Sequence, residues 1–333
     1  MITSIIKNVF PLNRRTEMSK VEYAVKKFSA FILIYFLSAV IGEGIIIGSL
    51  MALGYDPLHG NMPKGDAAVL LSYYGFAVFA TITIIYCKIF EKRTIKDLGL
   101  NKKVSNFLIG ALYAAILLII IVSISILANA IEYKSINKNV PIQSFVLFLL
   151  GYTIQSCTEE IMCRGFLLNS LRKKISVWPA IIISSTAFAL PHFSSMTGSI
   201  EYVIIGTINM YLISFIFSML MIKKKNLWIS CGLHSAWNFI LCFVMGLTLS
   251  GGESQSTGII LLNVKEKNIL NGGEFGMEAS IITTVVYAIV FAVLFKKKKA
   301  KKGLKIAGII LGVFVLVDII SFVVFVCLNG FPS

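Results

Sequence analysis

Nine long apolar segments dominate the sequence, and their lengths constrain the fold more than any other feature. About 20 consecutive apolar residues in an α-helix cross a bilayer core. The composition agrees, since 57% of the 333 residues are hydrophobic and 14% are charged, whereas about 25% of a soluble domain is charged. We therefore predict an all-α, polytopic membrane protein with about eight to nine transmembrane helices. The expected spans are 28–53, 67–90, 105–131, 143–171, 177–195, 200–222, 226–248, 279–295 and 304–328.

The basic residues fall mainly on one side of this predicted topology. A formal net charge of +15 is compatible with nucleic-acid binding or with basic cytoplasmic loops. If the N-terminus is cytoplasmic, 26 of the 31 Lys and Arg residues lie on the cytoplasmic side, as the positive-inside rule requires. We expect a multi-pass protein of the cell membrane that contacts the lipid bilayer and no nucleic acid. The basic segments are 1–27, 88–103, 164–174, 223–225 and 296–305.

The fourth span carries charged residues near its middle. Ionisable groups within spans are costly and are by default functional candidates. Glu160 and Arg164 are four residues apart, so they share a helix face and can neutralise each other. Glu159 points about 100° away around the helix and remains as a carboxylate able to take and give a proton. The alternative is a cluster of polar residues whose only role is to pack the helices together.

Two of the three histidines also fall inside predicted spans. His192 follows Pro191, which interrupts the backbone hydrogen-bond ladder and can redirect the ring into a cavity. His234 and Asn238 are four residues apart and share one helix face. The third histidine, His59, lies in a predicted external loop. The two histidines in spans, together with the glutamate pair, favour a functional site over helix packing.

These residues occur in an order that resembles a known family. Glu-Glu-xxx-Arg at 159–164, Phe-xxx-His at 188–192 and His-xxx-Asn at 234–238 are similar to the motifs of the CPBP family of intramembrane proteases. That family includes CAAX prenyl endopeptidases of the Ras-converting type and bacterial Abi proteins, some linked to bacteriocin self-immunity. The resemblance covers roughly residues 70–250.

The resemblance implies a role for each catalytic residue. Glu159 would activate the attacking water with help from His192, and His234 and Asn238 would stabilise the tetrahedral oxyanion. The implied reaction is hydrolysis of a peptide bond in a membrane-associated peptide or protein. Its substrate would be prenylated or otherwise lipidated, or would resemble a bacterial pheromone or bacteriocin precursor.

The resemblance implies a supporting role in the site for Glu160, which Arg164 would hold in place. It leaves open whether the site needs a metal. Family members are often classed as metalloproteases, and Glu159, His192 and His234 are a plausible zinc set by ligand type. The sequence lacks the HExxH motif, in which two histidines share a helix face with a glutamate base. We favour a glutamate-activated water without a cofactor, with zinc as the alternative.

The predicted spans and their charges, together with the resemblance for the protease core, indicate how the chain is organised. We expect a basic cytoplasmic segment at 1–27 and a transmembrane domain at 28–248, with the protease core at about 70–248. An extracytoplasmic loop would occupy 249–278, and additional transmembrane helices would lie within 279–333.

Two non-protease functions remain as alternatives. A non-enzymatic immunity or regulatory membrane protein could use the same fold as a binding module. A proton-coupled transporter could use buried Glu, Arg and His side chains as a relay. A transporter would typically show an inverted repeat with broken helices in both halves, but the motifs here cluster within 155–240.

Overall fold

The computed structural model describes residues 9–13, 17–63, 66–195, 199–249 and 258–295, which are mostly helical. The expected ninth span at 304–328 lies outside these ranges. The helices are α2 (Lys20–Ala52), α3 (Asp66–Phe90), α4 (Asn106–Leu127), α5 (Ile142–Glu160), α6 (Asn169–Leu171), α7 (Val177–Ala189), α8 (Ile200–Lys224), α9 (Trp228–Asn238) and α10 (Ile281–Phe295).

The lengths and apolar character of these helices confirm an all-α polytopic membrane protein. Within the described ranges, α2, α4, α8 and the Leu70–Phe90 part of α3 are long and apolar enough to cross a membrane. Three shorter apolar helical stretches are Val177–Phe193, Trp228–Val244 and Ile281–Phe295. Together with α5, these elements coincide with eight of the nine expected spans.

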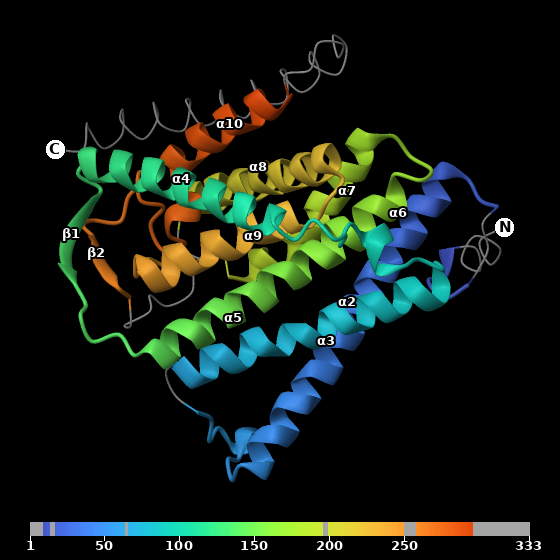
Figure 1. Ribbon diagram of the computed structural model, residues 1–333, viewed down its shortest axis with the longest axis horizontal. Coiled ribbons are helices and arrows are strands. Elements are labelled where there is room, and N and C mark those ends of the chain that lie inside the picture. The colour runs from blue at the N-terminus through green and yellow to red at the C-terminus, as the bar shows by residue number, and fades with distance from the viewer. Residues whose placement is uncertain (1–8, 14–16, 64–65, 196–198, 250–257, 296–333) are drawn as a thin grey trace.

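Helix α9 lies inside the bundle, beside α4, α5 and α8 (Figure 1). Two glycines bring the backbones of α4 and α9 into contact. A Cβ atom at Gly232 would lie 1.9 Å from the Phe107 carbonyl oxygen, and one at Gly110 would lie 2.0 Å from the Ile229 oxygen. Small residues of this kind allow close approach of membrane helices. The crossing holds residues 229–233 of α9, which directly precede His234, against α4.

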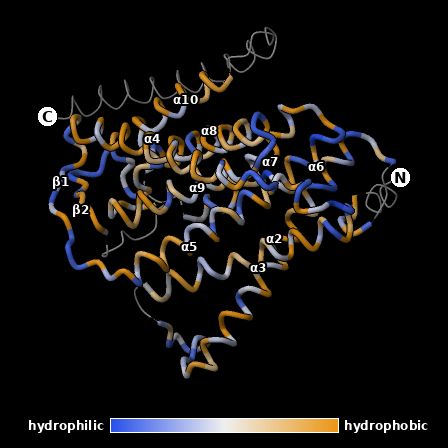
Figure 2. Tube along the Cα trace, in the orientation of Figure 1, coloured by the Kyte–Doolittle hydropathy of each residue, from blue (hydrophilic) through white to orange (hydrophobic). Residues whose placement is uncertain are grey.

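A two-stranded antiparallel sheet, absent from the sequence-based prediction, lies at one end of the bundle. Strand β1 (Ile131–Ile136) follows α4 and pairs with β2 (Ile260–Val264), which lies in the segment expected to be an external loop. Strands this short leave too little alternation to stand out between long apolar runs. Hydrophilic residues concentrate at this end and at the opposite end, near the N-terminus (Figure 2).

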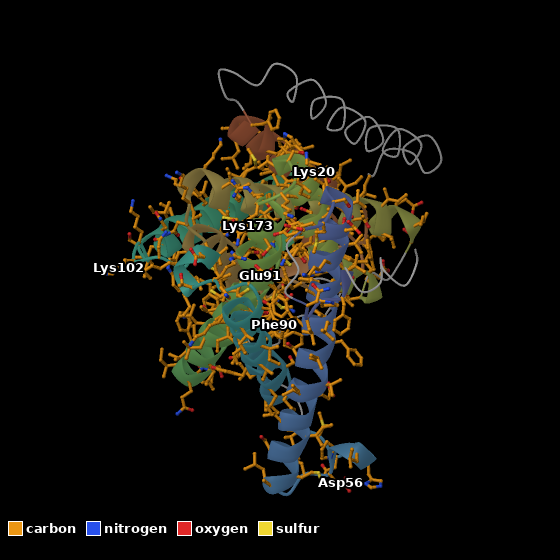
Figure 3. The ribbon with its side chains drawn as sticks, turned by 90° about the vertical axis from the view of Figure 1, so that its right-hand side faces the viewer. Lys20, Asp56, Phe90, Glu91, Lys102 and Lys173 are labelled. Atoms are coloured by element: carbon orange, nitrogen blue, oxygen red, sulfur yellow. The ribbon has the colours of Figure 1, made fainter. Side chains whose placement is uncertain are left out.

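Buried ion pairs join three segments expected on the cytoplasmic side. Lys27 at the start of α2 contacts Glu91 at 2.6 Å, just after α3 ends. Arg93 contacts Glu91 at 3.2 Å and donates to the Ser170 hydroxyl in α6 at 2.8 Å. Asp56, on the predicted external side, lies at a distant tip of the molecule (Figure 3). These segments therefore share one end of the bundle, as the alternating topology requires.

Candidate active site

Glu159 and Glu160 end α5 at its junction with the π-helical segment η3 (Ile161–Leu168). π-Helical turns are rare and frequently lie at functional sites. Arg164, within η3, donates through Nη1 to Glu160 Oε1 at 2.8 Å, and both side chains are fully buried. The pairing expected from their spacing is therefore present.

The guanidinium of Arg164 is enclosed by further partners from two other helices. Its Nη2 donates to the Ser214 hydroxyl in α8 at 2.5 Å. The ring centroids of Phe188 and Phe217 lie 4.4 and 5.1 Å from the guanidinium carbon, in cation–π range. Because a buried cation requires a compensating partner, Glu160 is committed to Arg164 and is poorly placed to act as a base.

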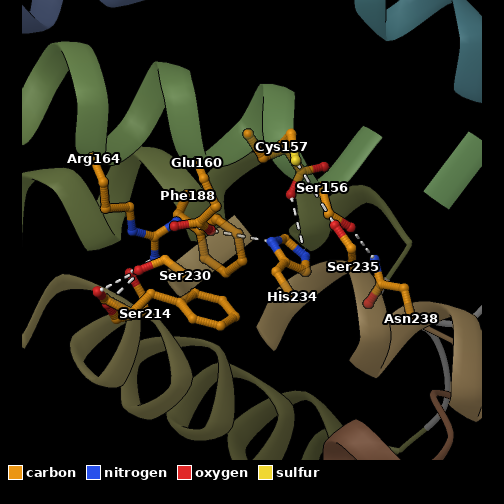
Figure 4. A network of polar contacts seen from close by, with 12 residues as sticks. Ser156, Cys157, Glu160, Arg164, Phe188, Ser214, Ser230, His234, Ser235 and Asn238 are labelled. Atoms are coloured by element: carbon orange, nitrogen blue, oxygen red, sulfur yellow. Dashed lines mark hydrogen bonds and ion pairs between the residues drawn. The ribbon is translucent and has the colours of Figure 1, made fainter. Parts of the chain in front are cut away.

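The imidazole of His234 lies between the two glutamates. Nδ1 is 3.1 Å from Glu160 Oε1, and Nε2 is 3.8 Å from Glu159 Oε2. The ring stacks on Phe217 with a centroid distance of 5.0 Å. Figure 4 shows His234 reaching from α9 toward α5, on the side where Glu160 meets Arg164. The structure thus brings His234 of the third sequence motif to the carboxylate pair of the first.

Glu159 belongs to a chain of amide hydrogen bonds. Gln155 donates through Nε2 to Glu159 Oε1 at 2.5 Å, and its Oε1 accepts from Asn238 Nδ2 at 3.0 Å. The same Asn238 nitrogen donates to the Ser156 hydroxyl at 3.2 Å. A carboxylate only accepts, so it fixes the orientation of Gln155 and, through Gln155, that of Asn238. Oε2 of Glu159 is buried and has no hydrogen-bond partner among the described residues.

His192 lies on the short 3-10 turn η4 (Leu190–Ser194) that follows α7. The α-helix ends at Ala189, and the turn contains Pro191, as expected from the missing proline N–H. His192 Nδ1 lies 2.9 Å from the Phe188 carbonyl oxygen. A carbonyl only accepts, so Nδ1 carries hydrogen, and Nε2 of the neutral ring is an acceptor.

Two cavities adjoin these residues. The aromatic cavity, about 210 Å³, is lined by Glu159 and His192 together with Phe31, Tyr35 and Phe79. The polar cavity, about 190 Å³, is lined by residues from several parts of the chain, including polar groups of α5 and α9. Phe188 and His192 line both cavities. The main polar lining of the second cavity is Tyr73, Gln155, His192, His234, Trp237, Asn238 and Glu278.

The candidate zinc ligands do not fit a catalytic zinc site. Such a site takes three protein ligands around one ion. Among the residues that the structure describes, no three His, Cys, Asp or Glu side chains are grouped to hold a metal. We therefore derive the chemistry of the site from the side chains alone.

Several residues of the site were missed by the sequence analysis. Gln155 lies four residues before Glu159 on α5, and this spacing is a signal that could have found it. Ser214 and Phe217 lie in the apolar α8, where nothing local distinguishes them. Glu278 falls in the segment interpreted as an external loop, yet it is 8% exposed and lines the polar cavity.

One family model matches the part of the chain that holds this site. Residues 141–240 match the family model described as Type II CAAX prenyl endopeptidase Rce1-like. This part of the chain is similar to the Rce1-like family. The Rce1-like segment begins just before α5 and ends two residues after Asn238, so it contains every motif residue of the site. The resemblance to CAAX-type intramembrane proteases is thus confirmed at the level of the family. No curated protein matches the chain, and neither does any solved structure.

Proposed function

We propose that the protein is an intramembrane endopeptidase that hydrolyses a peptide bond by means of water activated by Glu159. One observation carries the proposal: of two adjacent buried glutamates, Glu160 is neutralised by Arg164, whereas Glu159 lines a cavity beside His192. A carboxylate that is not committed to a buried guanidinium is suited to accept a proton from water. Gln155 orients it through the hydrogen bond to Oε1.

His192 would orient the water from the other side of the cavity. Its Nδ1 hydrogen is donated to Phe188, which leaves Nε2 as an acceptor for one water hydrogen. The second water hydrogen would be taken by Glu159. In this arrangement the water oxygen is held between two acceptors, with a lone pair directed at the substrate carbonyl.

His234 is proposed to stabilise the oxyanion directly, with Asn238 acting mainly through Gln155. Nε2 of His234 faces Glu159 Oε2 at 3.8 Å, beyond direct hydrogen-bond distance, so the pair has room for a shared proton or a bridging group. With a proton on Nε2 as well as on Nδ1, His234 is an imidazolium and can donate to the oxyanion. Asn238 donates to Gln155 and Ser156, so its direct donation to substrate requires one of these bonds to open.

The reaction follows from these roles with its atoms balanced. The water oxygen forms a bond to the scissile carbonyl carbon while its proton passes to Glu159. The carbon–nitrogen bond then breaks, and Glu159 returns the proton to the leaving amine. The products are a carboxylic acid and an amine, and no redox partner is required.

The proposed substrate is a membrane-associated peptide or protein of the cell membrane. The aromatic cavity beside Glu159 is lined by Phe31 and Tyr35 of α2 and by Phe79 of α3, a lining that suits apolar or lipidated segments. Prenylated tails, pheromone precursors and bacteriocin leaders all belong to this class. In the proposed topology, the N-terminus of the protein is in the cytoplasm.

Comparative peptidomics tests this proposal. Membranes from cells producing the wild-type protein or Glu159→Gln would be analysed by mass spectrometry for new peptide termini. We expect termini that depend on Glu159, and synthetic quenched peptides spanning those sites should be cleaved by purified wild-type protein in nanodiscs. Glu43→Gln, which alters an exposed glutamate of α2, is the matched control and should cleave normally.

The same experiment separates the protease from the two alternatives. A non-enzymatic immunity protein or a transporter would yield the same termini with wild-type and Glu159→Gln protein. Equal cleavage of the synthetic peptides by both proteins would also overturn the role of Glu159.

A further inference from the structure

The loop between β2 and α10 folds back into the protein. The Ser280 hydroxyl donates to the Leu270 carbonyl at 2.6 Å and ties the two sides of the loop together. Gly276 has φ of +90°, and a Cβ there would lie 2.6 Å from the Thr248 carbonyl oxygen, so only glycine suits this position. The loop therefore holds the 3-10 turn η6 (Met277–Ala279) in a defined, buried place.

A buried asparagine anchors this turn to the membrane-spanning helix α8. Asn209, near the middle of α8 and fully buried, donates through Nδ2 to the Glu278 carbonyl at 2.9 Å and to the Ser280 carbonyl at 3.0 Å. Thr283 donates to the Met277 carbonyl at 2.7 Å. The contacts with α8 place Glu278 well inside the bundle, where a carboxylate is costly and by default functional.

Glu278 supplies the carboxylate of the polar cavity. The described lining residues of this cavity include no Lys, Arg or Asp, and Glu278 is their one Glu. His234 and Asn238 line the same cavity. A positively charged group entering the cavity would therefore meet an opposite charge close to the residues proposed to handle the scissile bond.

Trp237 provides a second, independent indication that the cavity binds a polar ligand. Its side chain lines the cavity and is 2% exposed. The indole Nε1–H has no hydrogen-bond partner among the described residues, which is unusual for a buried donor. The lining of the cavity therefore includes a residue with an unpartnered N–H donor as well as a residue with a carboxylate.

We propose that the polar cavity is a substrate subsite that selects a Lys or Arg side chain next to the scissile bond, with Glu278 as the specificity-determining residue. The inference rests on the proposed protease function. Trp237 would donate to a backbone carbonyl of the same substrate segment. The cavity volume of about 190 Å³ is several times the volume of roughly 30 Å³ that one water molecule occupies in the liquid. The cavity therefore has room for one long side chain.

Paired peptides test the subsite with the full-length protein in nanodiscs. Each pair consists of two versions of one quenched peptide from the peptidomics experiment. The two versions differ at a single residue beside the scissile bond, which is Lys in one and uncharged norleucine in the other. Both sides of the scissile bond are varied. For wild-type protein we expect kcat/KM to favour Lys by about tenfold or more on one side. In Glu278→Gln this ratio should fall towards one.

Glu266→Gln is the matched control, because it makes the same change at an exposed glutamate of the same loop; it should keep the wild-type ratio. Wild-type protein that cleaves both peptides of every pair equally would overturn the subsite, whether or not Glu278→Gln folds. An unchanged ratio in folded Glu278→Gln would do the same. Absence of all cleavage by the wild type would instead overturn the proposed function, and the subsite with it.

Discussion

The Nδ1 atom of His234 lies 3.1 Å from Glu160 Oε1, the same oxygen that accepts the 2.8 Å hydrogen bond from Arg164. One buried carboxylate oxygen therefore orients the imidazole and balances the guanidinium. Because a carboxylate only accepts, Nδ1 of His234 carries hydrogen and Nε2 is directed to Glu159. Glu160 thus couples the stability of the bundle to the geometry of the catalytic pair.

Removal of Glu160 should destabilise the protein strongly. In Glu160→Ala the fully buried Arg164 loses its counter-charge, and loss of one partner of a buried ion pair costs about 3–5 kcal/mol. Thermal unfolding in detergent should show a markedly lower Tm for Glu160→Ala, whereas Glu159→Gln should stay near the wild type. Equal Tm values for Glu160→Ala and the wild type would contradict the pairing as a stabilising element.

Asn238 should act on catalysis largely through Gln155. If Asn238 holds Gln155, which in turn orients Glu159, Asn238→Ala and Gln155→Ala should each lower kcat, and the double variant should be little worse than either. Direct donation to the oxyanion would instead make the two effects multiply, with a loss of about 10²–10³-fold from Asn238→Ala alone. Turnover of the quenched peptides by the three variants distinguishes the two roles.

The ion pair at Glu91 should make stability depend on pH below about 4. Burial alone would raise the pKa of Glu91, but Lys27, the Ser170 hydroxyl and Arg93 together hold this pKa below its ordinary value. A depressed pKa stabilises the fold above the ordinary value of about 4.3, and the stabilisation is lost as pH falls through the folded-state value. Glu91→Gln should therefore have a lower Tm than the wild type at pH 7, and the difference should shrink in acid. A constant difference would contradict this assignment.

Activity should not require a bound metal. The side chains around Glu159 do not form a three-ligand site within the described part of the chain. Protein treated exhaustively with a chelator should therefore turn over the quenched peptides at the untreated rate. Activity that is lost on chelation and restored by added zinc would reinstate Glu159, His192 and His234 as ligands.

Relationships within a single helix were predictable from the sequence. The lengths of the apolar runs indicated the spans, because about 20 residues of helix match the bilayer core. The four-residue spacing of Glu160 and Arg164 indicated their pairing, since helical periodicity alone places such residues side by side. Pro191 indicated where the backbone hydrogen-bond ladder of the 177–195 span would be interrupted, because proline lacks the N–H that the helix requires.

Relationships between helices were decided by the tertiary structure. His234 reaches the glutamate pair because Gly110 and Gly232 let α4 and α9 meet backbone to backbone, which holds α9 beside α5. Glu278 reaches the polar cavity because Asn209 binds its turn inside the bundle. Sequence periodicity carries no information on which remote segments meet. That choice depends on close packing and on pairing of buried polar groups across helices.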